Sequence, residues 1–163
     1  MKCGMFRIPG AVAIAIGLLC VLALPLGARD KNVPTRPIRA TGHMTVTVTP
    51  DPLTYPIANF HLDEIGNATH TGLYTSVGNG TMDLSTGAWL GATGVTTAAN
   101  GRDTFNWVMN PDHTIVISGG TGKFENASWS FVPNVVFLSD PVPNPDGTFT
   151  IYMVYTIDTV GTF

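Results

Sequence analysis

The sequence predicts an all-β protein: an antiparallel, eight-stranded closed β-barrel preceded by an N-terminal signal helix. Three observations predict it. Apolar and polar residues alternate in several segments after residue 40, turn signals recur about every 8 to 15 residues, and no window in that region has a helical period. An antiparallel sandwich would satisfy the same pattern, but closing the sheet removes exposed strand edges, so we favour the barrel.

The first 28 residues have the layout of a secretory signal peptide. Lys2 and Arg7 supply positive charge, residues 11–24 form an apolar run, and small residues end the segment at Ala28. The run is shorter than the roughly 20 apolar residues of a membrane-spanning helix. We therefore expect cleavage near Ala28, secretion to the periplasm or the extracellular medium, and no stable membrane insertion afterwards. An uncleaved anchor is the alternative.

Composition limits the partners of the exported part. Both cysteines, Cys3 and Cys20, lie in the leader, so the barrel would contain neither a disulfide nor a cysteine zinc site. Residues 41–163 carry two Lys or Arg and ten Asp or Glu, which gives a net charge of −8. Because nucleic-acid affinity is built mainly from Lys and Arg contacts, nucleic acid is not expected as a partner.

The barrel domain is expected over residues 38–163, after a proline-containing linker at residues 29–37. Within the domain, apolar residues alternate with threonine and other polar residues over short segments, which is the pattern of half-buried strands. The predicted strands are residues 38–49, 58–63, 68–77, 88–99, 103–109, 114–118, 127–138 and 149–158.

Glycine and proline mark the boundaries between these strands. Gly66-Asn67 and Asn79-Gly80 are turn signals, and Asn100-Gly101 favours a type I′ hairpin. Pro133 is expected to break the strand at residues 127–138, because proline cannot donate a hydrogen bond to a ladder. Residues 81–84 are too short to assign.

A glycine-rich corner organises the second half of the domain. Residues 118–127 read S-G-G-T-G-K-F-E-N-A, and Gly119, Gly120 and Gly122 allow a positive φ or a close backbone contact. An apolar segment leads into this stretch, and Trp129 and Phe131 resume the alternation after it. The stretch therefore predicts a hairpin corner between two strands.

This corner carries a resemblance to a known family. G-G-T-G-K-F at residues 119–124 resembles the hallmark segment of the allene oxide cyclase and dirigent type of barrel. With G-N-A-T-H-T-G at residues 66–72 and T-A-A-N-G at residues 97–101, it forms a set similar to small bacterial secreted proteins of that barrel type. The set spans residues 66–127, about half of the exported part, and implies the eight-stranded barrel fold.

The resemblance also implies a class of activity. Members of the superfamily cyclise an unstable fatty-acid epoxide or steer the coupling of phenoxy radicals, in a hydrophobic cavity with a few polar groups. Residues 125–129 read E-N-A-S-W where dirigent proteins have R-M-A-R-G. The match therefore concerns turns and glycines, and no catalytic residue is carried over.

The inward-facing aromatic and Met residues leave two interpretations open: a filled core or the wall of a cavity that holds one small ligand. His70 is expected to bond a backbone carbonyl near a bulge, with a role in a pocket as the alternative. The candidate cavity-lining residues are His70, Tyr74, Phe105, Trp107, Met109, Met153 and Tyr155.

No metal or cofactor is expected. His61 and Asp63 are two apart in a strand and share a face, but a transition-metal site needs three or four converging ligands. The G-G-T-G stretch lacks the Lys-Ser/Thr pair and the helix of a phosphate-binding loop.

These observations favour a secreted, non-enzymatic module that binds a small apolar molecule or has a structural role. The alternative is a cyclase or isomerase, or a dirigent-like coupling protein, that acts through cavity shape and a few polar groups. That alternative requires a buried carboxylate or a Tyr or Asn pair that points inward. The sequence leaves the oligomeric state open.

Overall fold

The computed structural model describes residues 35–163, and the predicted signal helix lies outside these residues. The described part is all-β, as predicted, with a single 3₁₀ turn at Gly122–Phe124. It contains no helix with the length and hydropathy needed to span a membrane. The strands are β1 (Thr35–Thr49), β2 (Ile57–Ala68), β3 (Gly72–Asp83), β4 (Ala88–Thr97), β5 (Thr104–Met109), β6 (Ile115–Gly120), β7 (Ser128–Phe131), β8 (Asn134–Phe137), β9 (Val142–Pro143) and β10 (Phe149–Thr162).

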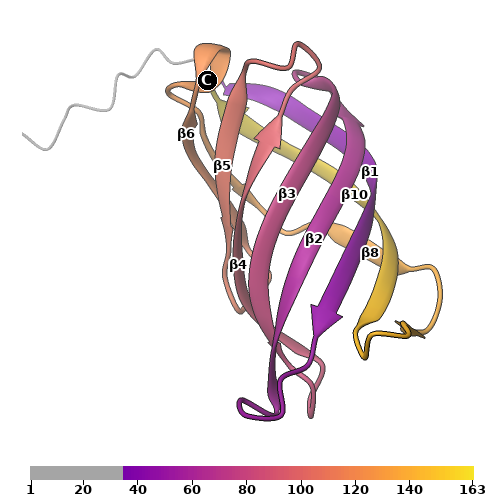
Figure 1. Ribbon diagram of the computed structural model, residues 1–163. Coiled ribbons are helices and arrows are strands. Elements are labelled where there is room, and N and C mark those ends of the chain that lie inside the picture. The colour runs from indigo at the N-terminus through magenta and orange to yellow at the C-terminus, as the bar shows by residue number, and fades with distance from the viewer. Residues whose placement is uncertain (1–34) are drawn as a thin grey trace, which may run out of the picture. The chain divides into compact units, whose positions relative to one another are not determined.

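Eight of these strands close into a barrel (Figure 1). Strands β1 to β7 pair in sequence order, β7 pairs with β10, and β10 pairs back with β1, all antiparallel. Strands β8 and β9 are not counted among these eight and pair only with β10. The prediction of an antiparallel, eight-stranded closed barrel is confirmed.

The seam between β1 and β10 is the longest pairing of the barrel. It runs from Thr35 opposite Thr162 to Val48 opposite Phe149. Strand β1 therefore begins inside the segment expected as a linker, and the start expected at residue 38 is three residues too late. The residues before the first predicted strand gain backbone hydrogen bonds from β10, which sequence alternation alone does not reveal.

Strands β7 and β8 are two parts of one interrupted strand. Ser128 of β7 opposes Thr162, and β8 continues along β10 in the same register, with Asn134 opposite Thr156. The strand is interrupted at Val132 and Pro133, as predicted, because proline has no amide proton to donate to a ladder, and pairing with β10 resumes at Asn134.

Two predicted turns are wrong. Gly66-Asn67 lies inside β2, and Asn79-Gly80 lies inside β3. These two positions leave no room for a side chain. A Cβ at Gly66 would lie 2.6 Å from Oη of Tyr74, and a Cβ at Gly80 would lie 2.7 Å from Cβ of Ala92. Glycine in a strand can mark close packing as well as a turn.

The hairpin at Asn100-Gly101 also differs from the prediction. Gly101 has a φ of 68°, but Asn100 does not have the positive φ that a type I′ turn requires. A longer loop forms instead, closed by a hydrogen bond of 2.9 Å from the amide of Ala98 to the carbonyl of Asp103. Asn100 Oδ1 stabilises the loop by accepting bonds of 3.0 Å from the amides of Arg102 and Asp103.

The glycine-rich corner joins β6 to β7 as predicted. Gly119 and Gly122 have φ values of 75° and 57°, a region that residues with a side chain rarely occupy. The 3₁₀ turn then directs Phe124 into the barrel, where it is 1% exposed. Phe124 packs edge-on against Phe105 and Phe163, with ring centroids 5.2 and 6.0 Å apart, so aromatic rings close this end of the barrel.

Candidate functional site

A pocket of about 410 Å³ lies inside the barrel. Inward-facing side chains from every strand of the ring form its wall, and most of them are aliphatic or aromatic. All seven residues predicted as cavity lining lie on this wall: His70, Tyr74, Phe105, Trp107, Met109, Met153 and Tyr155.

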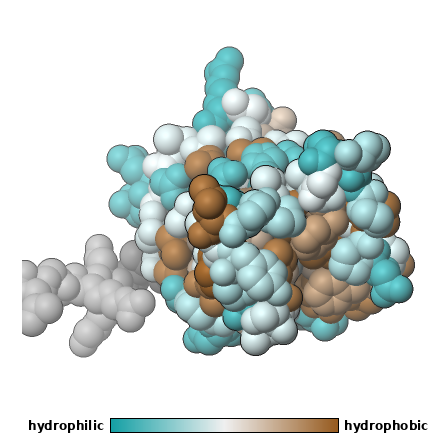
Figure 2. All heavy atoms as spheres, turned by 60° about the horizontal axis from the view of Figure 1, so that its bottom comes forward, coloured by the Kyte–Doolittle hydropathy of each residue, from teal (hydrophilic) through white to brown (hydrophobic). Residues whose placement is uncertain are grey.

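The pocket opens at the end of the barrel opposite the glycine-rich corner. The exposed residues on its wall lie there: Asp112 and His113 in the β5–β6 turn, and Val132 and Phe137, which are 61% and 58% exposed. At the other end, Phe124 is buried. Figure 2 shows the open end, where hydrophobic side chains lie between hydrophilic ones.

Glu64 brings a carboxyl group into this apolar pocket. Phe60 and Leu62 of β2 are buried, and the alternation of the strand places Glu64 on the same inner face. Glu64 is half-buried and lines the pocket, whereas its neighbours Asp63 and Ile65 are exposed.

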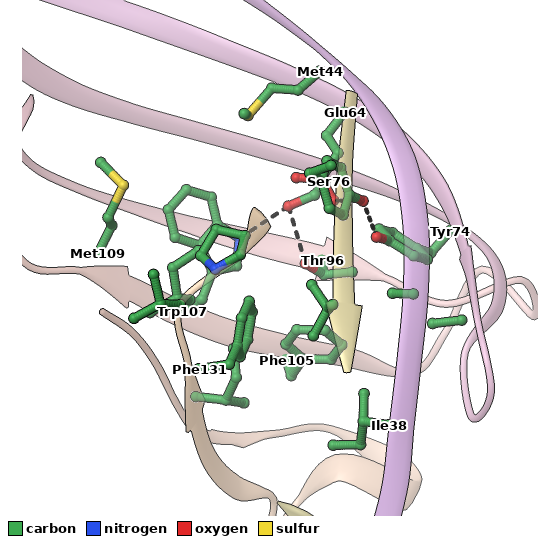
Figure 3. Close-up of a pocket in the computed structure, with 18 of the residues that line it drawn as sticks. Ile38, Met44, Glu64, Tyr74, Ser76, Thr96, Phe105, Trp107, Met109 and Phe131 are labelled. Atoms are coloured by element: carbon green, nitrogen blue, oxygen red, sulfur yellow. Dashed lines mark hydrogen bonds between the residues drawn. The ribbon is translucent and has the colours of Figure 1, made fainter. Parts of the chain in front are cut away.

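Two tyrosines hold this carboxyl group. Tyr155 of β10 donates a hydrogen bond from Oη to Glu64 Oε1, and Oη of Tyr74 bonds Oη of Tyr155 (Figure 3). Because the Tyr155 proton is used on Glu64, Tyr74 is the donor in the second bond. Gly42 and Gly66 make room for both rings, since a Cβ at Gly66 would lie 2.7 Å from Oη of Tyr155.

Burial sets the protonation of these three groups. Removal from water raises the pKa of Glu64 above its ordinary value of 4.5, and the nearby hydroxyl groups of Tyr155 and Tyr74 oppose this rise. Burial and the nearby Glu64 charge raise the pKa of both tyrosines well above the ordinary phenol value. Both phenols therefore keep their protons, and Glu64 is the group of the three that can gain or lose one.

A second polar cluster is centred on Ser76 and is fully satisfied. Ser76 Oγ accepts hydrogen bonds from Trp107 Nε1 at 2.9 Å and from Thr96 Oγ1 at 3.0 Å, and it donates to the carbonyl of Val95 at 3.3 Å (Figure 3). All the protons available to this cluster are used. Its role is to fix the indole ring of Trp107 as one wall of the pocket.

Glycines in the neighbouring strands make space for that ring. A Cβ at Gly78 would lie 2.5 Å from Cη2 of Trp107, and a Cβ at Gly94 would lie 2.5 Å from its Cε2. The indole therefore packs against the backbone of β3 and β4 and forms part of the pocket wall.

His70 has the environment that its sequence context predicts. Its Nε2 bonds the backbone carbonyl of Pro37 at 2.9 Å, and its ring packs edge-on against Phe163 with centroids 4.7 Å apart. The imidazole thus fastens the β2–β3 turn to β1 at the closed end of the pocket.

Six polar residues of the pocket wall are not among the candidates predicted from the sequence: Glu64, Thr71, Ser76, Thr96, Asp112 and His113. The alternation of β2 provides a signal for Glu64, which continues the inward series of Phe60 and Leu62. Phe149, an aromatic residue at the start of β10, packs against the core and is absent from the pocket wall.

The exposed pair His61 and Asp63 forms no part of this site. His61 Nε2 lies 3.5 Å from Asp63 Oδ2, and His61 Nδ1 lies 2.9 Å from Asn79 Oδ1, all on the outer surface of the barrel. Within residues 35–163, no group of three His, Cys, Asp or Glu side chains converges as a metal site requires.

Comparisons with protein-family models, with curated proteins and with solved structures find no match for this chain. The function of this protein is therefore inferred from the pocket itself.

Proposed function

We propose that this protein binds one small, largely apolar molecule inside the barrel. The observation that carries the proposal is the pocket of about 410 Å³, lined by aromatic, aliphatic and Met side chains around a few polar groups. Pockets for small molecules have this composition and fall within about 300 to 1,000 Å³.

Two features of the pocket support this proposal. Its open end has exposed apolar side chains, Val132 and Phe137, next to the wall, which gives an apolar ligand a path into the interior. Its wall is pre-formed, because Ser76 holds Trp107 and aromatic packing fixes Phe105 and Phe124. A rigid site loses little conformational entropy when a ligand binds.

The leader at residues 1–28 and the motif resemblance belong to the same proposal. The protein would be exported and would act as a ligand-binding barrel of the allene oxide cyclase and dirigent type. Edman sequencing of the protein from the culture medium or periplasm tests export, with an N-terminus just after Ala28 as the expected result.

Binding can be measured with N-phenyl-1-naphthylamine, an uncharged probe whose fluorescence rises in apolar surroundings. The blocking variant is Met44→Trp, because Met44 is half-buried, lines the pocket and allows a larger ring to fill the space. The matched control is His43→Trp, the adjacent residue of β1, which is exposed on the outer face.

The proposal predicts saturable binding of one probe molecule to the wild type and to H43W, and loss of binding in M44W. Equal binding to all three proteins would place the probe on the surface and would refute the pocket as the site. No binding to the wild type would refute the proposed function.

A second function, as an isomerase or cyclase, is favoured by one specific observation: Glu64 and the pair Tyr74 and Tyr155 meet on the pocket wall. A carboxyl group with a raised pKa in an apolar site is suited to proton transfer. The test is deuterium exchange next to the carbonyl of cyclododecanone in D₂O. Exchange that the wild type accelerates and Glu64→Gln does not would support this function, and equal rates would refute it.

A further inference from the structure

We propose that the ligand of this pocket is a neutral apolar molecule whose one polar group is a hydroxyl, and that this hydroxyl bonds to the Glu64 carboxyl group. The inference rests on the proposed binding function and adds the chemical class of the ligand. Two observations support it: the charged groups that face the pocket, and the polar atoms there that have no hydrogen-bond partner.

The described pocket wall contains no Lys or Arg. Of its ionisable groups, Asp112 and His113 are exposed at the open end, and His70 is bonded to the Pro37 carbonyl at the closed end. Glu64 is therefore the acidic group of the interior, and no fixed cation lies there to pair with an anionic ligand. An unpaired anion in an apolar site is strongly disfavoured.

The donor protons of the other interior polar groups are already used. Ser76 donates to the carbonyl of Val95, and Thr96 and Trp107 both donate to Ser76. Thr71 donates to the carbonyl of Gly72, Tyr155 donates to Glu64, and Tyr74 donates to Tyr155. Glu64 uses Oε1 for Tyr155, and Oε2 has no hydrogen-bond partner within residues 35–163. Since none of the described polar side-chain atoms is both buried and unpartnered, Oε2 is accessible, and Glu64 lines the pocket.

A hydroxyl group is the partner that suits this oxygen. It donates to an ionised carboxyl group and accepts from a protonated one, so it satisfies Glu64 in either state. A ligand carboxylate would place two like charges together, or would require an added proton. The geometry thus selects alcohols over acids of the same shape.

The test compares 4-tert-butylcyclohexanol with 4-tert-butylcyclohexanecarboxylate, which have the same apolar body. Each ligand displaces N-phenyl-1-naphthylamine from the wild type, Glu64→Gln and Glu64→Leu at about pH 8, where the free acid is ionised. Far-UV circular dichroism and urea denaturation check that both variants fold, and the probe affinity is measured in each protein so that displacement can be converted into ligand affinity.

In the wild type, the alcohol should bind about tenfold more tightly than the carboxylate, the effect of one buried polar interaction. Glu64→Gln should keep the alcohol affinity, since an amide also donates and accepts, and should strengthen carboxylate binding. Glu64→Leu should weaken alcohol binding about tenfold.

Equal affinity for the two ligands in the wild type, or a preference that persists in Glu64→Leu, would overturn the ligand class while leaving the binding function intact. Failure of the probe itself to bind the wild type would overturn both.

Discussion

The hydroxyl of Tyr155 donates a hydrogen bond to the carboxyl group of Glu64, although the two residues are 91 positions apart in the chain. They lie on β10 and β2, on either side of β1, and Gly42 of β1 pairs with Tyr155 on one side and with Gly66 on the other. The absence of a side chain at Gly42 and Gly66 lets the tyrosine ring reach across β1. The polar centre of the pocket therefore depends on the closure of the barrel.

Tyr155→Phe should lower the free energy of unfolding by about 1 to 3 kcal/mol, because the buried carboxyl group loses a hydrogen-bond donor. Urea denaturation checks this value. Tyr152→Phe is the matched control: Tyr152 is on the same strand, is 43% exposed, and should change stability by less than about 0.5 kcal/mol. Equal effects of the two substitutions would contradict the role assigned to the Tyr155 hydroxyl.

The stability of the wild type should fall as pH rises above 4.5, the ordinary pKa of Glu64. Burial raises the folded-state pKa above that of the unfolded chain, so in this window the folded protein holds more protons. Stability is then lost with rising pH until the folded pKa is passed, after which the contribution is constant.

Glu64→Gln lacks this titration, so its stability relative to the wild type should increase with pH across the same window. Urea denaturation of both proteins from about pH 4.5 to about pH 8 measures the difference. A difference between Glu64→Gln and the wild type that does not vary with pH would mean that the Glu64 carboxyl group titrates alike in the folded and unfolded states.

Gly94→Ala should destabilise the barrel by about 1 to 3 kcal/mol, because the new methyl group would overlap the indole of Trp107. A double-mutant cycle with Trp107→Phe gives the decisive measurement. The smaller ring relieves the overlap, so the added cost of Gly94→Ala should be smaller in the Trp107→Phe background. Strict additivity of the two costs would show that the ring does not lie against Gly94.

Ser76→Ala should also destabilise the protein by about 1 to 3 kcal/mol, since the indole N–H of Trp107 and the hydroxyl of Thr96 would lose their acceptor. Thr75→Ala, at the exposed neighbouring position, is the control. Thermal denaturation followed by Trp fluorescence compares the two. A Ser76→Ala protein as stable as the control would exclude Ser76 as the group that fixes Trp107.

The sequence predicts the barrel because the two faces of each strand differ in polarity. The alternation of β10 follows from this difference. The β6–β7 corner follows instead from its glycines, and the interruption between β7 and β8 follows from the missing amide proton of Pro133. Glycine is ambiguous in the same sequence: Asn79-Gly80 resembles a turn, yet Gly80 is a strand residue packed under the ring of Phe60. Only the pairing of β3 with β2 and β4 shows that this glycine lies in a strand.

The pocket wall was predictable in part. The aromatic and Met residues follow from alternation. Glu64 is the next inward-facing residue of β2 after Phe60 and Leu62, so it could have been predicted in the same way. The bond between Ser76 and Trp107 was not predictable, because the two residues are 31 positions apart and meet only through the register of β3, β4 and β5. Whether inward side chains fill the barrel or leave a pocket depends on this register as well.

The most direct test of an occupied pocket is the NMR spectrum of the protein with ¹³C-labelled Met methyl groups, titrated with 4-tert-butylcyclohexanol. Met44, Met109 and Met153 line the pocket, whereas Met82 is a buried core residue outside its wall. We predict that the first three methyl resonances shift together and saturate while that of Met82 stays in place. No shift at the three pocket methyl groups, or an equal shift at Met82, would contradict a ligand inside the barrel.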